Sequence, residues 1–515
     1  MMIEYQRESV CVSEASVAAF SQSYQETDVI VPDSKPDVAS ILQVDATAAV
    51  ISKICRENRV DIEAAVRINI LYVGDDGTVK SINASQHVLH QMEANGVAES
   101  MSAELECDVE NVEFEIVNSR KLSVRSLIGF DARVSMPLEI DVITGGGDES
   151  VETLSRCIRP YSAAGRVDSD ITVREKLEVP AGKPGIGTVL KTDTAVKLSD
   201  LKLASGKIIL KGSMAVTTLY IGDMEENVVQ FMEHEVSFTE ILEVSGAEEN
   251  MTADIVLGVK DCVIDIVEDS DGDARIMLAD AKISISGRVS RQVELNIIED
   301  LYSTSRSISA VKNTALVDKI VADKRTAVTL SEAAALPPDM PGIQQVYNVI
   351  AKPYLSGAKT EHGFITVEGV IDVYILYLST DESRPICTYK HEQPFSHRIE
   401  AENVAEDMFC DARVGIDSTS FNINLEREIQ LRLITSVQAK VIATEKMEYV
   451  ADVTENADEP AAADSGACIR IYFVQQGERL WDIAKRYRTT ISSLLAVNEL
   501  TSEAEVRAGG KLLIP

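Results

Sequence analysis

The chain has 515 residues, with 49 Lys and Arg against 83 Asp and Glu, so its formal net charge is −34. That charge argues against nucleic acid or an anionic membrane surface as a partner, because phosphate binding needs clustered basic residues. The chain lacks a run of about 18 apolar residues, an N-terminal segment with a signal-peptide core, and CxxC spacing among its eight cysteines, which argues against membrane-spanning and secreted proteins.

A long-period repeat is the clearest feature of the sequence. The pattern Pro-x-x-x-Pro occurs three times, with its first prolines 148 and then 157 residues apart. In each copy an aliphatic residue lies five positions after the second proline, a tyrosine 31 positions later, and a methionine 29 to 31 positions after that. The three sets are Pro32, Pro36, Ile41, Tyr72 and Met101; Pro180, Pro184, Val189, Tyr220 and Met251; and Pro337, Pro341, Val346, Tyr377 and Met408. This shared spacing predicts three homologous domains.

Within each copy, apolar and polar residues alternate over segments that we expect to be β-strands. The strand before the tyrosine spans 60–73, 207–221 or 364–378. A further strand pair is expected after each methionine, at 109–117 with 122–130, 261–267 with 274–285, and 412–423 with 428–441. The chain is therefore predicted to be mainly β, with three tandem sandwich-like or barrel-like domains. The proline pairs are expected to form a rigid entry into the first strand, with recognition by a partner module as the alternative.

The segments between these strands are less regular. Residues 154–175 and 315–335 are expected to carry short helices, and Gly145 to Gly147 a flexible joint. Residues 445–468 are acidic and rich in small side chains, which predicts a flexible linker. The predicted domain boundaries are therefore 1–150, 151–300 and 301–444 for the repeats, 445–468 for the linker and 469–515 for a C-terminal domain.

Residues 469–515 differ from the rest of the chain in both charge and pattern. They carry seven basic and five acidic residues, a net charge of +2, and the chain's single tryptophan, Trp481. The pattern predicts a strand at 471–474, helices at 480–487 and 490–498, and a last strand at 511–515. Thr490 is placed to cap the second helix. A small βααβ domain is the predicted outcome.

The spacing of its core residues resembles a LysM domain. The matching positions include Tyr472, Val474, Gly477, Leu480, Trp481, Ile483, Ala484, Tyr487, Ile491, Leu494, Asn498, Gly509, Leu512, Ile514 and Pro515. Glu478-Arg479 and Ala508-Gly509-Gly510 depart from the usual Asp-Thr and Pro-Gly-Gln. The resemblance implies binding of N-acetylglucosamine glycans through two loops. We predict a binding surface formed by Gly477, Glu478, Arg479, Leu480, Trp481, Arg486, Arg488, Asn498, Glu499 and Leu500. Its exposed rim is expected to consist of Arg479, Trp481, Arg486, Arg488 and Asn498. The alternative is that Leu480, Trp481 and Ile514 are simply core residues.

The three β repeats and the terminal LysM domain together resemble the SPOCS-domain proteins of endospore-forming bacteria. This resemblance implies a non-catalytic adaptor in spore coat assembly, located in the mother-cell cytoplasm at the forespore surface or coat. It also implies that the LysM domain docks on the stage IV A coat ATPase, with other coat proteins as further partners. The basic charge of the LysM domain on an acidic chain agrees with protein docking, since complementary charge steers association.

Two other functions are alternatives to this adaptor role. The LysM domain can instead bind peptidoglycan or its precursor, or can anchor a hydrolase to the wall. The hydrolase needs a catalytic constellation, and the sequence contains neither Gly-x-Ser-x-Gly nor His-Glu-x-x-His. We predict no catalytic residue, metal or cofactor. The cysteines and histidines at 387, 391, 397 and 410 lack zinc-finger spacing, and the acidic run at 269–273 is expected to be a hairpin tip.

Overall fold

The structure is a computed structural model that describes residues 5–223, 228–292, 294–381, 384–406, 408–455 and 470–515. Most of this part of the chain is β-strand, with two α-helices and one short 3-10 helix near the C-terminus. Within the described ranges, none of the helices has the length and apolar character needed to cross a membrane.

The first repeat is a sandwich of two three-stranded antiparallel sheets. One sheet has the order β1-β6-β5 and the other β2-β3-β4. Buried and half-buried residues alternate along β3, which places Val60, Ile62 and Ala64 on the core face. The strands are β1 (Tyr5–Ile30), β2 (Val38–Arg56), β3 (Arg59–Gly74), β4 (Val79–Glu93), β5 (Ser102–Asn118) and β6 (Lys121–Gly146).

The second and third repeats have the same topology, so the prediction of three tandem β domains is confirmed. Their sheets are β8-β13-β12 with β9-β10-β11, and β15-β20-β19 with β16-β17-β18. A two-stranded ribbon, β7 (Val151–Ile158) with β14 (Leu295–Ser303), is added to the second repeat. The remaining strands are β8 (Tyr161–Glu178), β9 (Ile186–Ala204), β10 (Lys207–Gly222), β11 (Val229–Glu243), β12 (Thr252–Glu268), β13 (Ala274–Gln292), β15 (Ile308–Ala335), β16 (Ile343–Glu361), β17 (Phe364–Ser379), β18 (Ile386–Glu400), β19 (Phe409–Leu425) and β20 (Glu428–Glu455).

The repeated prolines and tyrosines meet in every domain. The tyrosine side chain is fully buried in the sandwich, and its hydroxyl donates a hydrogen bond to the carbonyl of the second proline. The O–O distances are 3.1 Å for Tyr72, 3.1 Å for Tyr220 and 3.0 Å for Tyr377. Each tyrosine hydroxyl, buried in the core, thereby finds an acceptor in the proline loop. The fixed spacing therefore matches one repeated hydrogen bond that holds the loop against the second sheet.

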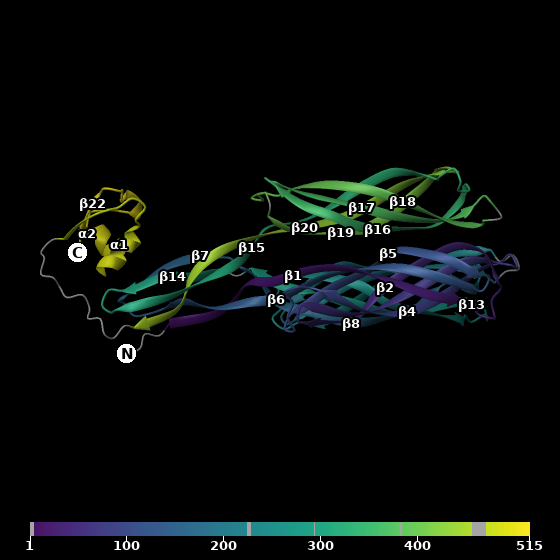
Figure 1. The fold of residues 1–515 in the computed structure, drawn as a ribbon, viewed down its shortest axis with the longest axis horizontal. Coiled ribbons are helices and arrows are strands. Elements are labelled where there is room, and N and C mark those ends of the chain that lie inside the picture. The colour runs from purple at the N-terminus through teal and green to yellow at the C-terminus, as the bar shows by residue number, and fades with distance from the viewer. Residues whose placement is uncertain (1–4, 224–227, 293, 382–383, 407, 456–469) are drawn as a thin grey trace.

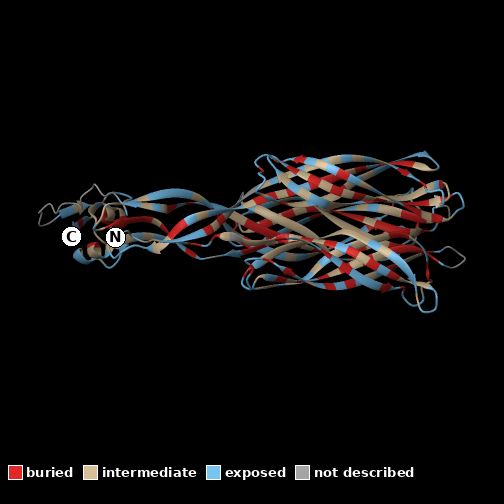
Figure 2. Ribbon diagram, turned by 90° about the horizontal axis from the view of Figure 1, so that it is seen from below, coloured by how far each residue is buried: buried red, intermediate tan, exposed pale blue. Residues whose placement is uncertain are grey.

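A narrow stalk extends from the body formed by the three sandwiches (Figure 1). It consists of three ribbons, residues 5–12 with 138–146, 151–158 with 295–303, and 308–320 with 442–455. Buried residues run along it as well as through the body (Figure 2). Its core takes side chains from all three ribbons: Val10, Val12, Val142, Ile158, Leu295, Ile297, Val317, Met447 and Tyr449. Each domain consequently begins and ends at the same stalk tip.

Two expectations about the connecting segments are wrong. Residues 154–175 and 315–335 form strands rather than helices, because their buried residues alternate with exposed ones, as in Val167, Ile171 and Val173. The acidic linker starts later than expected, since residues 445–455 complete β20 and pair with β15. Residues 456–468 of the expected linker lie outside the described residues.

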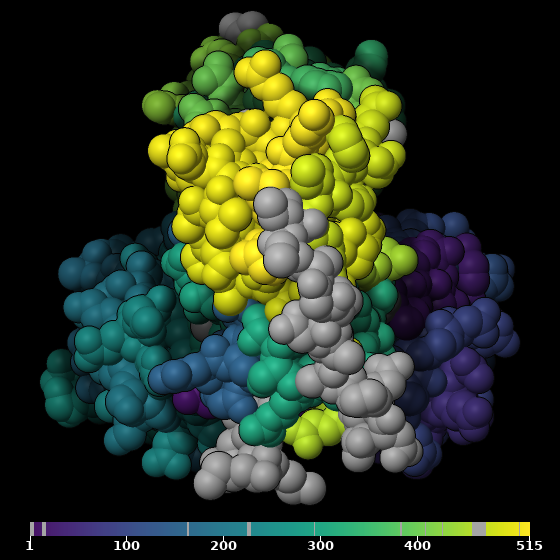
Figure 3. Space-filling view, turned by 90° about the vertical axis from the view of Figure 1, so that its left-hand side faces the viewer, coloured from purple at the N-terminus to yellow at the C-terminus, as the bar shows by residue number. Residues whose placement is uncertain are grey.

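The three sandwiches surround a common axis, with the C-terminal domain in front of them at the stalk end (Figure 3). An apolar cluster lies where their second sheets meet. It consists of Leu71, Val79, Leu190, Leu219, Ile221, Val229, Tyr347, Leu376 and Ile386. The body is therefore held together by a shared core as well as by the chain connections.

Candidate binding surface of the C-terminal domain

The C-terminal domain has the predicted βααβ order. It comprises β21 (Arg470–Phe473), α1 (Leu480–Tyr487), α2 (Ile491–Val497), the short 3-10 helix η1 (Glu503–Glu505) and β22 (Lys511–Ile514). Strands β21 and β22 pair antiparallel, and helix α2 begins at Thr490, whose hydroxyl accepts a hydrogen bond from the Ser493 N–H at 3.0 Å. The core beneath the helices is Val474, Leu480, Trp481, Ile483, Ala484, Leu494, Leu512 and Ile514.

Helix α1 docks this domain on the tip of the stalk. The indole N–H of Trp481 donates to the Asp300 carboxylate of β14 at 2.9 Å, and the Lys485 ammonium donates to both Asp300 oxygens at 2.7 and 2.8 Å. Lys312 of the third ribbon adds an ion pair to Asp300 at 3.1 Å. The Tyr302 ring packs edge-on against Trp481, with centroids 4.9 Å apart, and its hydroxyl donates to the Thr489 carbonyl.

Asp300 is buried between these groups, with 5% of its surface exposed. Burial would raise the pKa of its carboxyl, but the hydrogen bonds from Lys485 and Trp481 and the Lys312 contact hold that pKa below its ordinary value. Hydrogen bonds to a charged group contribute about 1.5–3 kcal/mol each. Because Lys485 and Lys312 are 40% and 41% exposed, the lower end of that range applies to them.

The first loop of the domain, residues 474–479, is fixed by Glu478. Its carboxylate accepts hydrogen bonds from the Tyr472 hydroxyl at 2.8 Å and the Gln475 N–H at 3.2 Å, and pairs with Arg486 at 2.8 Å. Burial would raise the pKa of Glu478, but these partners hold it below its ordinary value. The Glu478 carboxylate therefore serves the loop itself, while Gly477 and Arg479 stay exposed.

The second loop is fixed by Asn498. Its side-chain N–H groups donate to the carbonyls of Leu494 and Leu513, both at 2.8 Å, and its oxygen accepts from the Leu513 N–H at 2.7 Å. Two of these bonds tie the end of α2 to β22, and the third caps α2 itself. Glu499 adopts a left-handed conformation with φ 55° and is exposed, whereas Leu500 packs against the domain core.

The ten residues of the predicted binding surface therefore do not form one exposed rim. Trp481 and Leu480 are each 3% exposed, so the expectation of an exposed Trp481 is wrong. Both side chains pack in the core of their own domain, and Asp300, which lies 181 positions before Trp481, accepts its indole N–H. Arg488 ends α1 in a left-handed conformation with φ 50° and is half-buried. The exposed members are Gly477, Arg479, Arg486 and Glu499.

The sequence reasoning missed an exposed apolar face on the two-stranded sheet. Ile471 pairs with Leu513 across the ladder and Phe473 with Lys511, and their side chains point away from the helices. Ile471 is 55%, Phe473 52% and Leu513 39% exposed, and Val497 at the end of α2 is 44% exposed. The Lys511 ammonium lies 5.9 Å from the Phe473 ring centroid. We call Ile471, Phe473 and Leu513 the sheet face. The signal was a run of apolar residues at 471–474, where a strand with one buried face needs only alternate ones.

Comparison with known families matches this organisation. The family model described as SipL, SPOCS domain matches at residues 37–117, 185–267 and 342–424, and the LysM domain model matches residues 472–515. The chain is thus a tandem β-repeat protein with a terminal LysM module. It belongs with the SipL family of SPOCS-domain proteins, which makes it a sporulation-related protein of the spore coat type. No curated protein and no solved structure matches it.

Proposed function

We propose that this protein is a non-catalytic adaptor of endospore coat assembly that docks on the stage IV A coat ATPase through its LysM domain. The observation that carries the proposal is the position of that domain. It is fixed at the stalk tip through one side of α1, while the sheet face remains exposed. The proposed location is the mother-cell cytoplasm at the forespore surface, with further coat proteins binding the SPOCS domains.

Charge and apolar exposure both favour protein docking. The LysM segment carries +2 in a chain of −34, and the Lys511 ammonium lies beside Phe473 of the sheet face. Exposed contiguous apolar side chains on a small domain usually mark an interaction site. Such a surface suits a partner segment with apolar anchors and acidic neighbours, because opposite charge steers the encounter and apolar burial holds the complex.

The test is binding of the purified full chain to the purified coat ATPase. The substitution Phe473→Glu is expected to weaken binding at least 10-fold, and Lys511→Glu to slow association and flatten its salt dependence. Leu89→Glu is the matched control, since Leu89 is 81% exposed on β4 and far along the chain from the LysM domain. Unchanged affinity of the Phe473→Glu protein would reject the sheet face as the contact.

Glycan binding is the second candidate, favoured by the LysM family match and by the exposed loop residues Gly477, Arg479 and Glu499. The same full chain is assayed against chitin oligomers and peptidoglycan fragments. If glycan is the ligand, Arg479→Ala and Glu499→Ala reduce glycan binding and leave ATPase binding unchanged. Binding of glycan together with no binding of the ATPase would replace the protein-docking proposal.

A further inference from the structure

The three repeats are joined by a set of ion pairs whose members occupy equivalent positions. An arginine after the β5-type strand bonds the proline loop of its own domain: Arg120, Arg275 and Arg427. Thirteen positions after each of these lies a basic residue: Arg133, Arg288 and Lys440. Three positions after each repeated methionine lies an acidic residue: Glu104, Asp254 and Asp411.

Each basic residue pairs with the acidic residue of a different domain, and always in the same direction. Arg133 of the first domain meets Asp411 of the third at 2.5 Å, and Arg288 of the second meets Glu104 of the first at 3.1 Å. Lys440 of the third domain meets Asp254 of the second. The cycle therefore closes on itself, as in a ring of three subunits joined by one heterologous interface.

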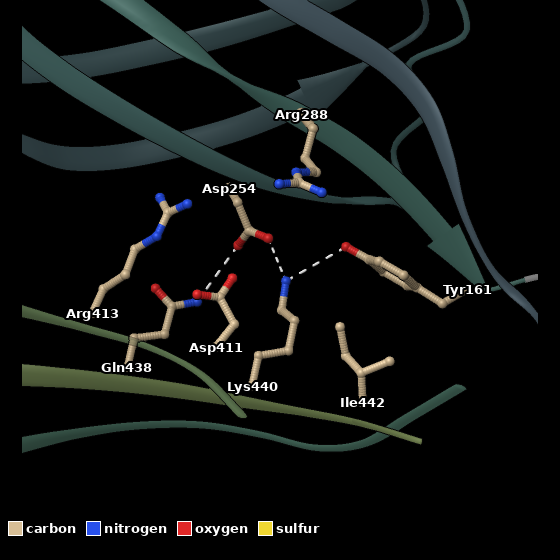
Figure 4. A pocket seen from close by; sticks show the side chains of 8 residues that line it. All are labelled: Tyr161, Asp254, Arg288, Asp411, Arg413, Gln438, Lys440 and Ile442. Carbon is tan, nitrogen blue, oxygen red and sulfur yellow. Dashed lines mark hydrogen bonds and ion pairs between the residues drawn. The ribbon is translucent and has the colours of Figure 1, made fainter. Parts of the chain in front are cut away.

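The junction between the second and third domains shows how this ring is buried (Figure 4). Lys440 points between Asp254 and the Tyr161 hydroxyl, and these groups line a cavity of about 40 Å³ together with Arg288 and Asp411. The side chains of Arg288 and Lys440 are only 14% and 9% exposed. Charges this far from water persist only when paired, so each domain depends on its neighbour's partner.

A second cycle runs in the opposite direction farther along the strands. Arg67 of the first domain bonds the Lys260 carbonyl and Asp261 of the second, at 2.6 and 3.0 Å. Lys197 of the second meets Asp417 of the third. The Tyr354 hydroxyl and the Lys352 ammonium of the third domain complete the cycle on Asp108 of the first, at 3.2 and 3.5 Å.

The axial core obeys the same equivalence. The residue before each repeated tyrosine is a leucine, and Leu71, Leu219 and Leu376 meet on the axis. The first residue of each following strand, Val79 or Val229 or Ile386, lies in the same cluster. The first charged cycle and the apolar axis thus use equivalent positions of the three domains, and the second cycle adds one further contact at each domain boundary.

We infer that each SPOCS domain carries both halves of a closed, domain-to-domain interface, so that the partner this surface fits is another copy of the same domain. In this chain the partners are supplied in cis, and the body is a covalently linked trimer. The connections are only residues 147–150 and 304–307, both at the stalk tip. The interface itself, and not these connections, holds the three domains together.

The test cuts the connections in the folded full chain. Protease sites are inserted within 147–150 and 304–307, the protein is cleaved, and native mass spectrometry counts the fragments. The expected result is one complex of all three fragments in equal amounts. The first fragment is decisive, because the Asp300 contact of the LysM domain ties only the second and third fragments together. Release of the first fragment from the otherwise unchanged, cleaved protein would overturn the inference.

Charge reversal shows whether the ring carries the assembly. Arg288→Glu in the cleaved chain places a second carboxylate at Glu104 and is expected to release the first fragment at a salt concentration where the parent complex stays intact. Arg174→Glu is the matched control, because Arg174 pairs with Asp280 inside the second domain. Equal release by Arg288→Glu and Arg174→Glu would remove the ring from the interface.

Discussion

Trp481 and Asp300 share a hydrogen bond of 2.9 Å that joins the LysM domain to the end of the second domain's stalk ribbon. Asp300 receives Lys485 and Lys312 as well, so one carboxylate collects three donors from two parts of the chain. The contact decides which side of the LysM domain can meet a partner, because it covers α1 and leaves the sheet face exposed.

Replacing Asp300 with alanine is expected to release the LysM domain from the stalk. The buried indole N–H would lose its acceptor, at a cost of about 1–3 kcal/mol, and the two ammonium groups, which are 40% and 41% exposed, would add little to it. Trp481 is the only tryptophan of the chain, so its fluorescence reports docking directly. We expect a red-shifted emission. Asp280→Ala, which removes an exposed acid of β13, is the control and should leave the emission unchanged.

The same contact is expected to depend on pH. The pKa of Asp300 lies below its ordinary value of 3.8 in the folded protein. A depressed carboxyl pKa adds stability that is fully present above the unfolded pKa and is lost as the pH falls through the folded pKa. Trp481 emission should therefore stay constant above about pH 5 and shift only below 3.8. In the Asp300→Asn protein this transition should be absent, and its persistence would assign it to another group.

The features that the sequence predicted are local ones, which depend on contacts within a single domain. Strand alternation and the proline-to-tyrosine spacing predicted the sandwich strands of all three repeats, because each follows from a residue's own strand and its nearest partner. The stretch 445–455 was wrongly predicted to be a linker because its composition is acidic. Its acidic residues Glu445, Glu448 and Asp452 lie on the exposed side of β20. The buried side, with Met447, Tyr449 and Val450, shows the strand.

The sequence predicted the fold of the C-terminal domain but not which of its residues are exposed. The LysM pattern includes Trp481 and Leu480, and a core position is the alternative expectation for both. Trp481 donates its hydrogen bond to Asp300, which lies 181 positions earlier in the chain. This contact depends on where the stalk places β14 relative to the LysM domain, and a local sequence pattern carries no information about that. The interdomain ring is similar: the offsets of 13 and three positions are visible in the sequence, but which acid faces which base is set by the packing of the three sandwiches.

Removing the repeated tyrosine hydroxyl tests the physical basis of the sequence repeat. Tyr220→Phe leaves the half-buried Pro184 carbonyl without this donor, which costs about 0.5–1.5 kcal/mol. For a domain of this size that corresponds to a fall in the unfolding midpoint of roughly 2–4 °C per kcal/mol. Differential scanning calorimetry measures it, with Tyr24→Phe as control because Tyr24 is 73% exposed. Equal midpoints for the two variants would show that the hydroxyl bond adds nothing.

The last prediction concerns a pair of facing residues in each repeat, in which a smaller residue lies opposite a larger one. Gly212 on β10 lies opposite Phe238 on β11, and Gly369 lies opposite Phe395 in the third domain. The equivalent pair of the first domain, eight positions before its tyrosine, is Ala64 with Val88. A Cβ on Gly212 would overlap the Phe238 ring, so Gly212→Ala overpacks the core.

Overpacking of this kind costs about 1–3 kcal/mol. Gly212→Ala is therefore expected to lower the unfolding midpoint, and the double variant Gly212→Ala, Phe238→Val to recover most of the loss by reproducing the pair of the first domain. Phe238→Val alone should be destabilising, since it leaves a cavity beside the glycine. Thermal unfolding of the four proteins forms a double-mutant cycle, and simple additivity of the two changes would mean that the glycine does not serve to accommodate the ring.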